Sequence, residues 1–194
     1  MDGGRKHIMT RLPDTGKVTL MTFAGKYKYL TGTGCILSGI SAVIALVPYL
    51  CMWKVIKLAV LNWPGGLAGG TLVWGWMAVA SSLLSMLIYF GALMCTHLSA
   101  FRTARNMKTA ALHHLAELPI GYFKGTGSGK LRRIIDDGAG QTETYLAHQL
   151  PDLAGALVTP AAVLVLLLVF DWRFGLISLI PMAVGTFFLS RMMG

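Results

Sequence analysis

The sequence predicts an all-α membrane protein with four transmembrane helices and long cytoplasmic helical extensions. Its 194 residues are 55% hydrophobic and 13% charged, with a mean hydropathy of +0.62, whereas a soluble domain carries about a quarter charged residues. The apolar residues fall into four charge-free runs, over residues 29–53, 58–101, 153–170 and 174–190. Each run approaches or exceeds the roughly 20 residues with which a helix crosses the hydrocarbon core.

The net charge of +9 indicates how the helices are oriented. Of the seventeen Lys and Arg residues, six precede the first apolar run and seven lie between the second and third, while Lys54, Lys57 and Arg173 occupy the other two connections. By the positive-inside rule, the N-terminus, the long middle loop and the C-terminus are cytoplasmic. The basic residues are not interleaved with aromatic ones on a soluble element, so nucleic acid is not an expected partner.

The first two helices follow from these runs. A polar segment of residues 1–25 precedes a first helix over residues 29–53, which is longer than the apolar part of a signal peptide and is therefore expected to stay in the membrane. Lys54 and Lys57 mark its outer end, and the paired glycines after Pro64 indicate a turn. A second helix over residues 71–118 is longer than a bilayer needs, so it is expected to project into the cytoplasm as an amphipathic leg.

A glycine-rich loop follows, and then the second half of the chain. The loop is expected over residues 119–138, with Ser128 as the N-cap of a short helix from Lys130 to Asp137. A second amphipathic leg leads into a third membrane helix, together covering residues 139–170. A fourth helix over residues 174–192 follows after Asp171-Trp172-Arg173, which predicts a tight antiparallel hairpin at the outer face, where Trp172 suits the interface.

Several kinds of reactive site are disfavoured by the residue spacing. The segment around Gly129-Lys130 lacks the earlier glycine and the following Ser or Thr of a phosphate-binding loop. His113 and His114 are adjacent and would point about 100° apart on a helix, so no metal site is expected. No cluster of acid, base and nucleophile suggests catalysis. The cysteines, Cys35, Cys51 and Cys95, have no paired spacing and read as small apolar residues.

The second apolar run contains polar and aromatic residues that are candidates for lining a translocation pathway. The candidates for lining the pathway are Trp76, Ser82 and Tyr89. The competing interpretation is that the Trp anchors the helix at the interface and the Ser packs against another helix. Ion coupling is disfavoured, because a carboxylate at membrane depth is not evident in the runs.

The middle loop resembles that of ABC transporter transmembrane domains with the exporter fold. Leu118-Pro119, the aromatic pair Tyr122-Phe123, four further residues and then Ser128-Gly129-Lys130-Leu131 are similar to the signature of the family's first intracellular loop. Leu150-Pro151 before the third helix and Asp171-Trp172-Arg173-Phe174 after it are also similar. Ser128 and Lys130 depart from the commoner Thr and acidic residue, and Asp136-Asp137 is one place off the usual Asn-Asp.

The resemblance implies partners and roles that composition does not reveal. It implies that the tip is the first coupling helix, which rests on a nucleotide-binding domain through Ser128, Gly129, Lys130, Leu131, Arg132 and Ile134. ATP and Mg would then be bound by that domain, and this chain itself would hold no cofactor. The expected partners are the nucleotide-binding domain, a second half-transporter (identical or different), the lipid bilayer and a small-molecule substrate, in a bacterial plasma membrane with the N-terminus cytoplasmic.

The family has six membrane helices followed by a nucleotide-binding domain, so residues 26–194 resemble the N-terminal part of a half-transporter. Such a chain is not expected to hydrolyse ATP alone. The segments Ile134-Ile135-Asp136-Asp137 and His148-Gln149-Leu150-Pro151-Asp152 resemble the subgroup that includes siderophore importers built on the exporter fold. The alternative is a standalone four-helix membrane adaptor or small channel without ATP coupling, which leaves the long lever and its tip without a role.

Overall fold

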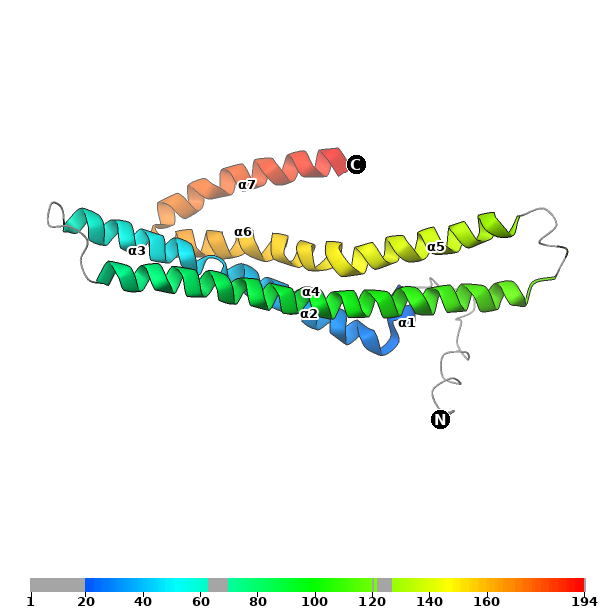
Figure 1. The fold of residues 1–194 in the computed structure, drawn as a ribbon. Helices are drawn as coiled ribbons and strands as arrows, with labels where there is room; N and C mark the ends of the chain where they lie inside the picture. The colour runs from blue at the N-terminus through cyan, green and yellow to red at the C-terminus, as the bar shows by residue number, and fades with distance from the viewer. Residues whose placement is uncertain (1–19, 63–69, 120, 122–126, 194) are drawn as a thin grey trace.

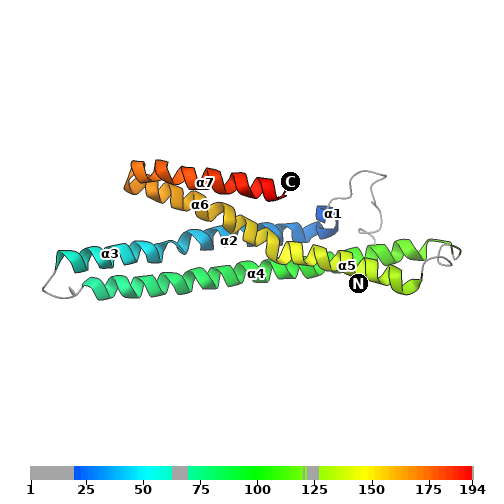
Figure 2. The ribbon, with the colours of Figure 1, turned by 90° about the horizontal axis from the view of Figure 1, so that it is seen from above.

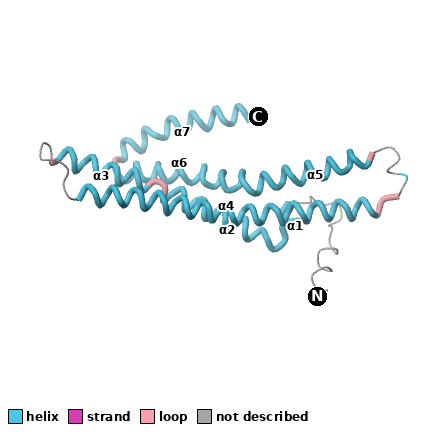
Figure 3. Tube along the Cα trace, in the orientation of Figure 1, coloured by secondary structure: helices cyan, strands magenta, loops and turns pink. Residues whose placement is uncertain are grey.

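A computed structural model describes residues 20–62, 70–119, 121 and 127–193, and these residues are almost entirely helical (Figure 3). Two short elements, α1 (Leu20–Ala24) and the 3-10 turn η1 (Gly25–Tyr27), lead into α2 (Lys28–Ile44) and α3 (Val47–Leu61). Next come the 47-residue α4 (Gly70–Ala116) and α5 (Ser128–Thr144). A π-helical turn, η3 (Tyr145–Gln149), joins α5 to α6 (Leu150–Phe170), and α7 (Trp172–Met193) completes the fold.

The described helices form an elongated bundle arranged along α4 (Figures 1 and 2). The α2–α3 segment packs antiparallel on α4 from near its start to beyond its middle, α5 packs antiparallel on the second half of α4, and α6 packs mainly on α2. With about 1.5 Å per residue, α4 is about 70 Å long, more than twice the roughly 30 Å of a hydrocarbon core. The second helix therefore projects well beyond a bilayer, as the sequence predicts.

The first membrane helix is longer than the expected 29–53. It runs from Lys28 to Leu61 with a single interruption at Ala45 and Leu46, just before Pro48, and Asn62 caps its end. It does not stop at the lysines, because Lys54 lies over the rings of Trp53 and Trp74, at 5.2 and 5.8 Å from their centroids. An ammonium on an aromatic face is stabilised, and its aliphatic stem lies along the helix. The residues 63–66 of the expected turn lie outside the described residues.

The second leg begins earlier than the sequence analysis expects. Residues 128–138, assigned there to the loop with a separate short helix, are the first turns of α5, which continues through η3 into α6. The N-cap is Gly127 rather than Ser128, and no side chain caps the helix. Gly138 and Gly140 do not break it: each glycine costs about 1 kcal/mol relative to Ala, and packing of α5 against α4 offsets that cost.

The interior where α2, α4 and η3 meet is built from small residues. Ala92, Thr96, Ser99, Ala100 and Thr103 are fully buried. A Cβ on Gly34 would overlap the Thr96 methyl and lie 3.1 Å from the Ala92 carbonyl oxygen, so the two helices touch backbone to side chain there. Small residues permit this close approach, which is how membrane helices pack when lipid tails are as apolar as their own side chains.

Hydroxyl groups connect the helices across this interior. Thr31 and Ser99 share a hydrogen bond of 2.7 Å, and Ser38 donates to the carbonyl oxygen of Pro151 at 2.7 Å. Ser41 and Ser85 each donate to the other's carbonyl oxygen, at 3.0 and 3.1 Å. These bonds satisfy polar groups that would otherwise lack a hydrogen-bond partner in apolar surroundings.

The π-helical turn lies where the second leg changes partner. Before η3 the helix follows α4, and after η3 it leaves α4 and lies across α2 (Figure 2). Thr96 donates to the carbonyl oxygen of Ala147, inside this turn, at 3.1 Å. Extra residues in a π-turn disturb the regular hydrogen-bond ladder and are a recognised cause of helix bending.

Three helical segments of the described residues are long and apolar enough to cross a membrane: Thr22–Leu61, Gly70–Ala116 and Ser128–Phe170. The stretch Trp172–Phe188 is apolar but shorter. It belongs to α7, which turns back at Asp171, packs on the end of α6 where Gly175 lies against Leu168, and then diverges from α6 (Figure 1). The chain is thus an all-α integral membrane protein, and its described residues hold three long spans and a fourth, shorter apolar helix.

Candidate functional site

The first turns of α5 carry the residues expected at the cytoplasmic tip. They lie at the end of the bundle opposite the α3–α4 connection (Figure 1). Leu131 is half-buried, and the other five expected contact residues are exposed: Ser128, Gly129, Lys130, Arg132 and Ile134. The exposed fraction of Ile134 is 58%. The tip thus presents an apolar side chain among basic ones on a helical surface, the composition of a protein contact.

One ion pair joins this surface to α4, and a second ion pair to the same carboxylate lies within α5. Lys108 on α4 lies 2.9 Å from Asp136 on α5, and Arg132 also reaches Asp136, at 3.6 Å. The hydrogen bond and charge of Lys108, with a smaller contribution from Arg132, hold the pKa of the Asp136 carboxyl below its ordinary value. A force applied to the start of α5 is therefore transmitted to both legs.

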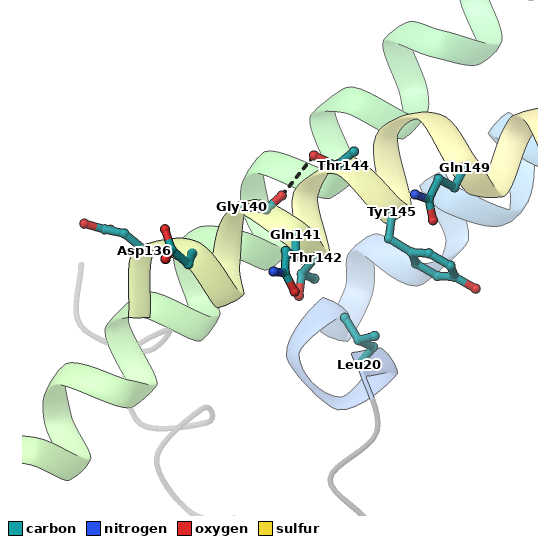
Figure 4. Close-up of a pocket in the computed structure, with 9 residues that line it drawn as sticks. Leu20, Asp136, Gly140, Gln141, Thr142, Thr144, Tyr145 and Gln149 are labelled. Atoms are coloured by element: carbon teal, nitrogen blue, oxygen red, sulfur yellow. Dashed lines mark hydrogen bonds between the residues drawn. The ribbon is translucent and has the colours of Figure 1, made fainter. Parts of the chain in front are cut away.

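An open pocket of about 800 Å³ lies between α1 and the α5–η3 segment (Figure 4). Most of its lining residues have polar side chains, among them Asp136, Gln141, Thr142, Tyr145 and Gln149. Leu20 of α1 faces these side chains from the other side, as Figure 4 shows. Apart from Leu20, its lining residues lie between positions 136 and 149, outside the apolar runs.

The three pathway candidates on α4 have different surroundings. Trp76 is 68% exposed, and Ser82 is exposed and bonds only to its own helix, donating to the carbonyl oxygen of Ala78 at 2.9 Å. Tyr89 is half-buried, and its hydroxyl donates to Oδ1 of Asp152 at 2.8 Å. The structure therefore brings one of the three, Tyr89, into contact with an ionisable group.

Two histidines that are 51 residues apart in sequence also meet beside this pair. The rings of His97 on α4 and His148 in η3 are 4.7 Å apart between centroids and nearly perpendicular, at 84°. From the sequence, only the adjacent His113 and His114 are weighed as metal ligands, and the third apolar run begins at residue 153, directly after Asp152. Among the described residues no group of three or more His, Cys, Asp or Glu side chains is arranged to hold a metal ion.

A sequence signal for these pairs existed in the hairpin formed by α4 and α5–α6. The midpoint between Lys108 and Asp136 is position 122, and the midpoints of the other two pairs fall within two positions of it. In an antiparallel hairpin, residues equidistant from the tip face each other. Reflection about position 122 would have placed position 147 opposite His97 and position 155 opposite Tyr89, one and three residues from the partners that the structure shows.

Comparison with known proteins identifies relatives of the chain. The sequence profile of the ABC transporter transmembrane region matches residues 32–194. The mycobactin import ATP-binding/permease protein IrtA of Mycolicibacterium smegmatis is 32% identical over 164 residues, which is 83% of this chain and 19% of the relative. The proteins of that name from Mycolicibacterium thermoresistibile and Mycobacterium tuberculosis are 30% and 29% identical, over 81% and 77% of this chain. The chain spans about a fifth of the length of these relatives.

Proposed function

Because this chain belongs to the family of ABC transporter transmembrane regions, we propose that it forms part of the translocation pathway of an ATP-driven transporter and is moved by a nucleotide-binding domain. The observation that carries the proposal is the α4–α5 hairpin, two packed helices that extend far beyond a bilayer and end in an exposed tip. Two helices held together by packing and by the Lys108–Asp136 ion pair act as a lever with one contact point.

The tip is the proposed contact for the nucleotide-binding domain, through Ser128, Gly129, Lys130, Leu131, Arg132 and Ile134. Exposure of Ile134 among basic residues supports this role. ATP and Mg would be bound by the partner, and a second half-transporter would complete the pathway. Trp76, Ser82 and Tyr89 stay in the proposal as pathway-lining residues.

The proposed substrate class is a small iron-chelating siderophore, and the proposed direction is import. The support is the name that the three relatives share, mycobactin import ATP-binding/permease protein. The proposed location is the bacterial plasma membrane with the N-terminus cytoplasmic, supported by the lysines and arginines that gather in the N-terminal segment and the middle loop.

Site-directed cross-linking tests the coupling role. The chain, with Cys35, Cys51 and Cys95 replaced by Ala, is co-purified with the ATP-binding region of the M. smegmatis relative, and a cysteine is placed at Lys130. We expect Lys130→Cys to cross-link efficiently to the ATP-binding region. The matched control is Gln141→Cys, exposed on the same helix about 16 Å away. Equal yields from the two positions would contradict the coupling role and favour a membrane protein that works without ATP.

A further inference from the structure

The pair Tyr89–Asp152 lies at membrane depth. The outer boundary is marked by Trp53, which contacts Phe170 with ring centroids 5.2 Å apart, and by Trp74, which shares Lys54 with it. From Trp74 to Tyr89 is 15 residues, about 22 Å, and from Phe170 back to Asp152 is 18 residues, about 27 Å. Both distances fall within the roughly 30 Å of the hydrocarbon core, in its cytoplasmic half.

His97 and His148 continue the same seam toward the cytoplasm. They lie 23 and 22 residues from the same two aromatic markers, about 33 to 35 Å, which places them at the inner boundary of the membrane. His148 precedes Asp152 by four residues, so the two are neighbours on consecutive turns. The seam between α4 and the η3–α6 segment thus carries four polar side chains: Tyr89, His97, His148 and Asp152.

These side chains are not sealed inside the bundle. His148 and Asp152 are exposed, whereas the preceding residues Ala147 and Pro151, about 100° away around the same helix, are buried against α4 and α2. An exposed carboxylate within the core faces either lipid or water, and the cost of exposing a charge to lipid means that such groups face a water-filled cavity. The π-turn beside them is a second indication of a functional site, since π-turns inside α-helices are frequent at such sites.

We propose that this seam faces the water-filled translocation pathway and that Asp152, held by Tyr89, is a binding subsite for a positively charged or hydrogen-bond-donating group of the transported molecule. The Tyr89 hydroxyl donates its hydrogen bond to Oδ1 of the Asp152 carboxylate. Within the described part of the chain no Lys or Arg lies within ion-pair distance of Asp152. The carboxylate therefore presents its negative charge and its second oxygen to whatever enters the pathway. The subsite rests on the proposed transport function.

Charged thiol reagents test the subsite without requiring transport. In membrane sheets open on both sides, His148→Cys in the chain lacking its three native cysteines is reacted with a cationic and an anionic membrane-impermeant methanethiosulfonate of similar size. Rates are normalised to those of a free thiol in solution. We expect the cationic reagent to react roughly tenfold faster, since a unit charge one helical turn away creates a potential of this order. Asp152→Asn in the same background should bring the ratio close to one.

The lipid-facing control is Leu153→Cys, next to Asp152 and 54% exposed. We expect it to be labelled at a small fraction of the His148→Cys rate. Equal labelling of the two positions, absence of labelling at His148→Cys, or a ratio that Asp152→Asn leaves unchanged would each overturn the subsite. The cross-linking from Lys130→Cys has an independent readout, so a failed subsite and a failed coupling role are distinguishable.

Discussion

At the scale of single residues, Gly34 has less room for a Cβ than any other glycine on α2. The Thr96 side chain that it touches is fully buried, and the Thr96 hydroxyl donates to the carbonyl oxygens of Leu93 and Ala147. Rotating Thr96 to make room would break these bonds. Gly32, two residues earlier, has open space around it.

Gly34→Ala should therefore lower the free energy of unfolding by about 1 to 3 kcal/mol, the usual cost of overpacking. Gly32→Ala has the same gain in helix propensity and no clash, so it should be neutral or stabilising by up to about 1 kcal/mol. Thermal unfolding of the purified chain in detergent measures both. Equal effects of the two substitutions would show that the α2–α4 crossing is looser than described.

Asp136 is the residue whose charge state depends on the α4–α5 contact. Its pKa is lowered by Lys108, so the stabilisation from this pair is present above the ordinary carboxyl pKa of about 4 and is lost as the pH falls through the lowered value. Lys108→Gln should raise the pKa of Asp136 toward its ordinary value. Carboxyl carbon chemical shifts, assigned with Asp136→Asn, follow the titration.

The control for this titration is Lys130→Gln, which removes an exposed lysine from the same helix. It should leave the Asp136 titration closer to that of the unmodified chain than Lys108→Gln does. A midpoint that is the same with and without Lys108 would mean that the two legs are not joined by this ion pair.

At the scale of elements, α5 is a continuous helix through two glycines. A Cβ at Gly138 meets nothing within 4 Å, and its φ is not positive. Gly138→Ala should therefore stabilise α5 by roughly 0.5 to 1 kcal/mol. Amide hydrogen exchange measures this, and we expect it to be slower over residues 131–144 in Gly138→Ala than in the unmodified chain. Faster exchange would support the loop that the sequence analysis placed here.

The loop with its small helix was expected because the stretch up to Gly129 is rich in glycine, and local propensity favours a break there. Propensity was overridden by contacts between residues far apart in the chain, such as Lys108 with Asp136, 28 residues apart. The end of the first helix was misplaced for a similar reason: Trp74, on the next helix, receives Lys54. By contrast, the bounds of α4 were predicted closely, because its apolar run and its amphipathic continuation are both local patterns.

At the scale of the whole molecule, the two ends of the bundle should lie on opposite sides of the membrane. Asn62, at the end of α3, is exposed at one end, and Lys130 is exposed at the other. With single cysteines at these positions, an impermeant thiol reagent should label Asn62→Cys in intact spheroplasts and Lys130→Cys in inside-out vesicles only. The reverse pattern would contradict the orientation that the basic residues predict.

The sequence by itself determined the class of the protein, its apolar spans, the projecting hairpin and the family resemblance, because hydropathy, charge and turn residues act over a few neighbouring positions. Only the tertiary structure decided which side chains meet across the helices: Tyr89 with Asp152, His97 with His148, and Gly34 with Thr96. Those contacts depend on the register of the hairpin and on the bend at η3. Both are set by packing between segments far apart in the chain.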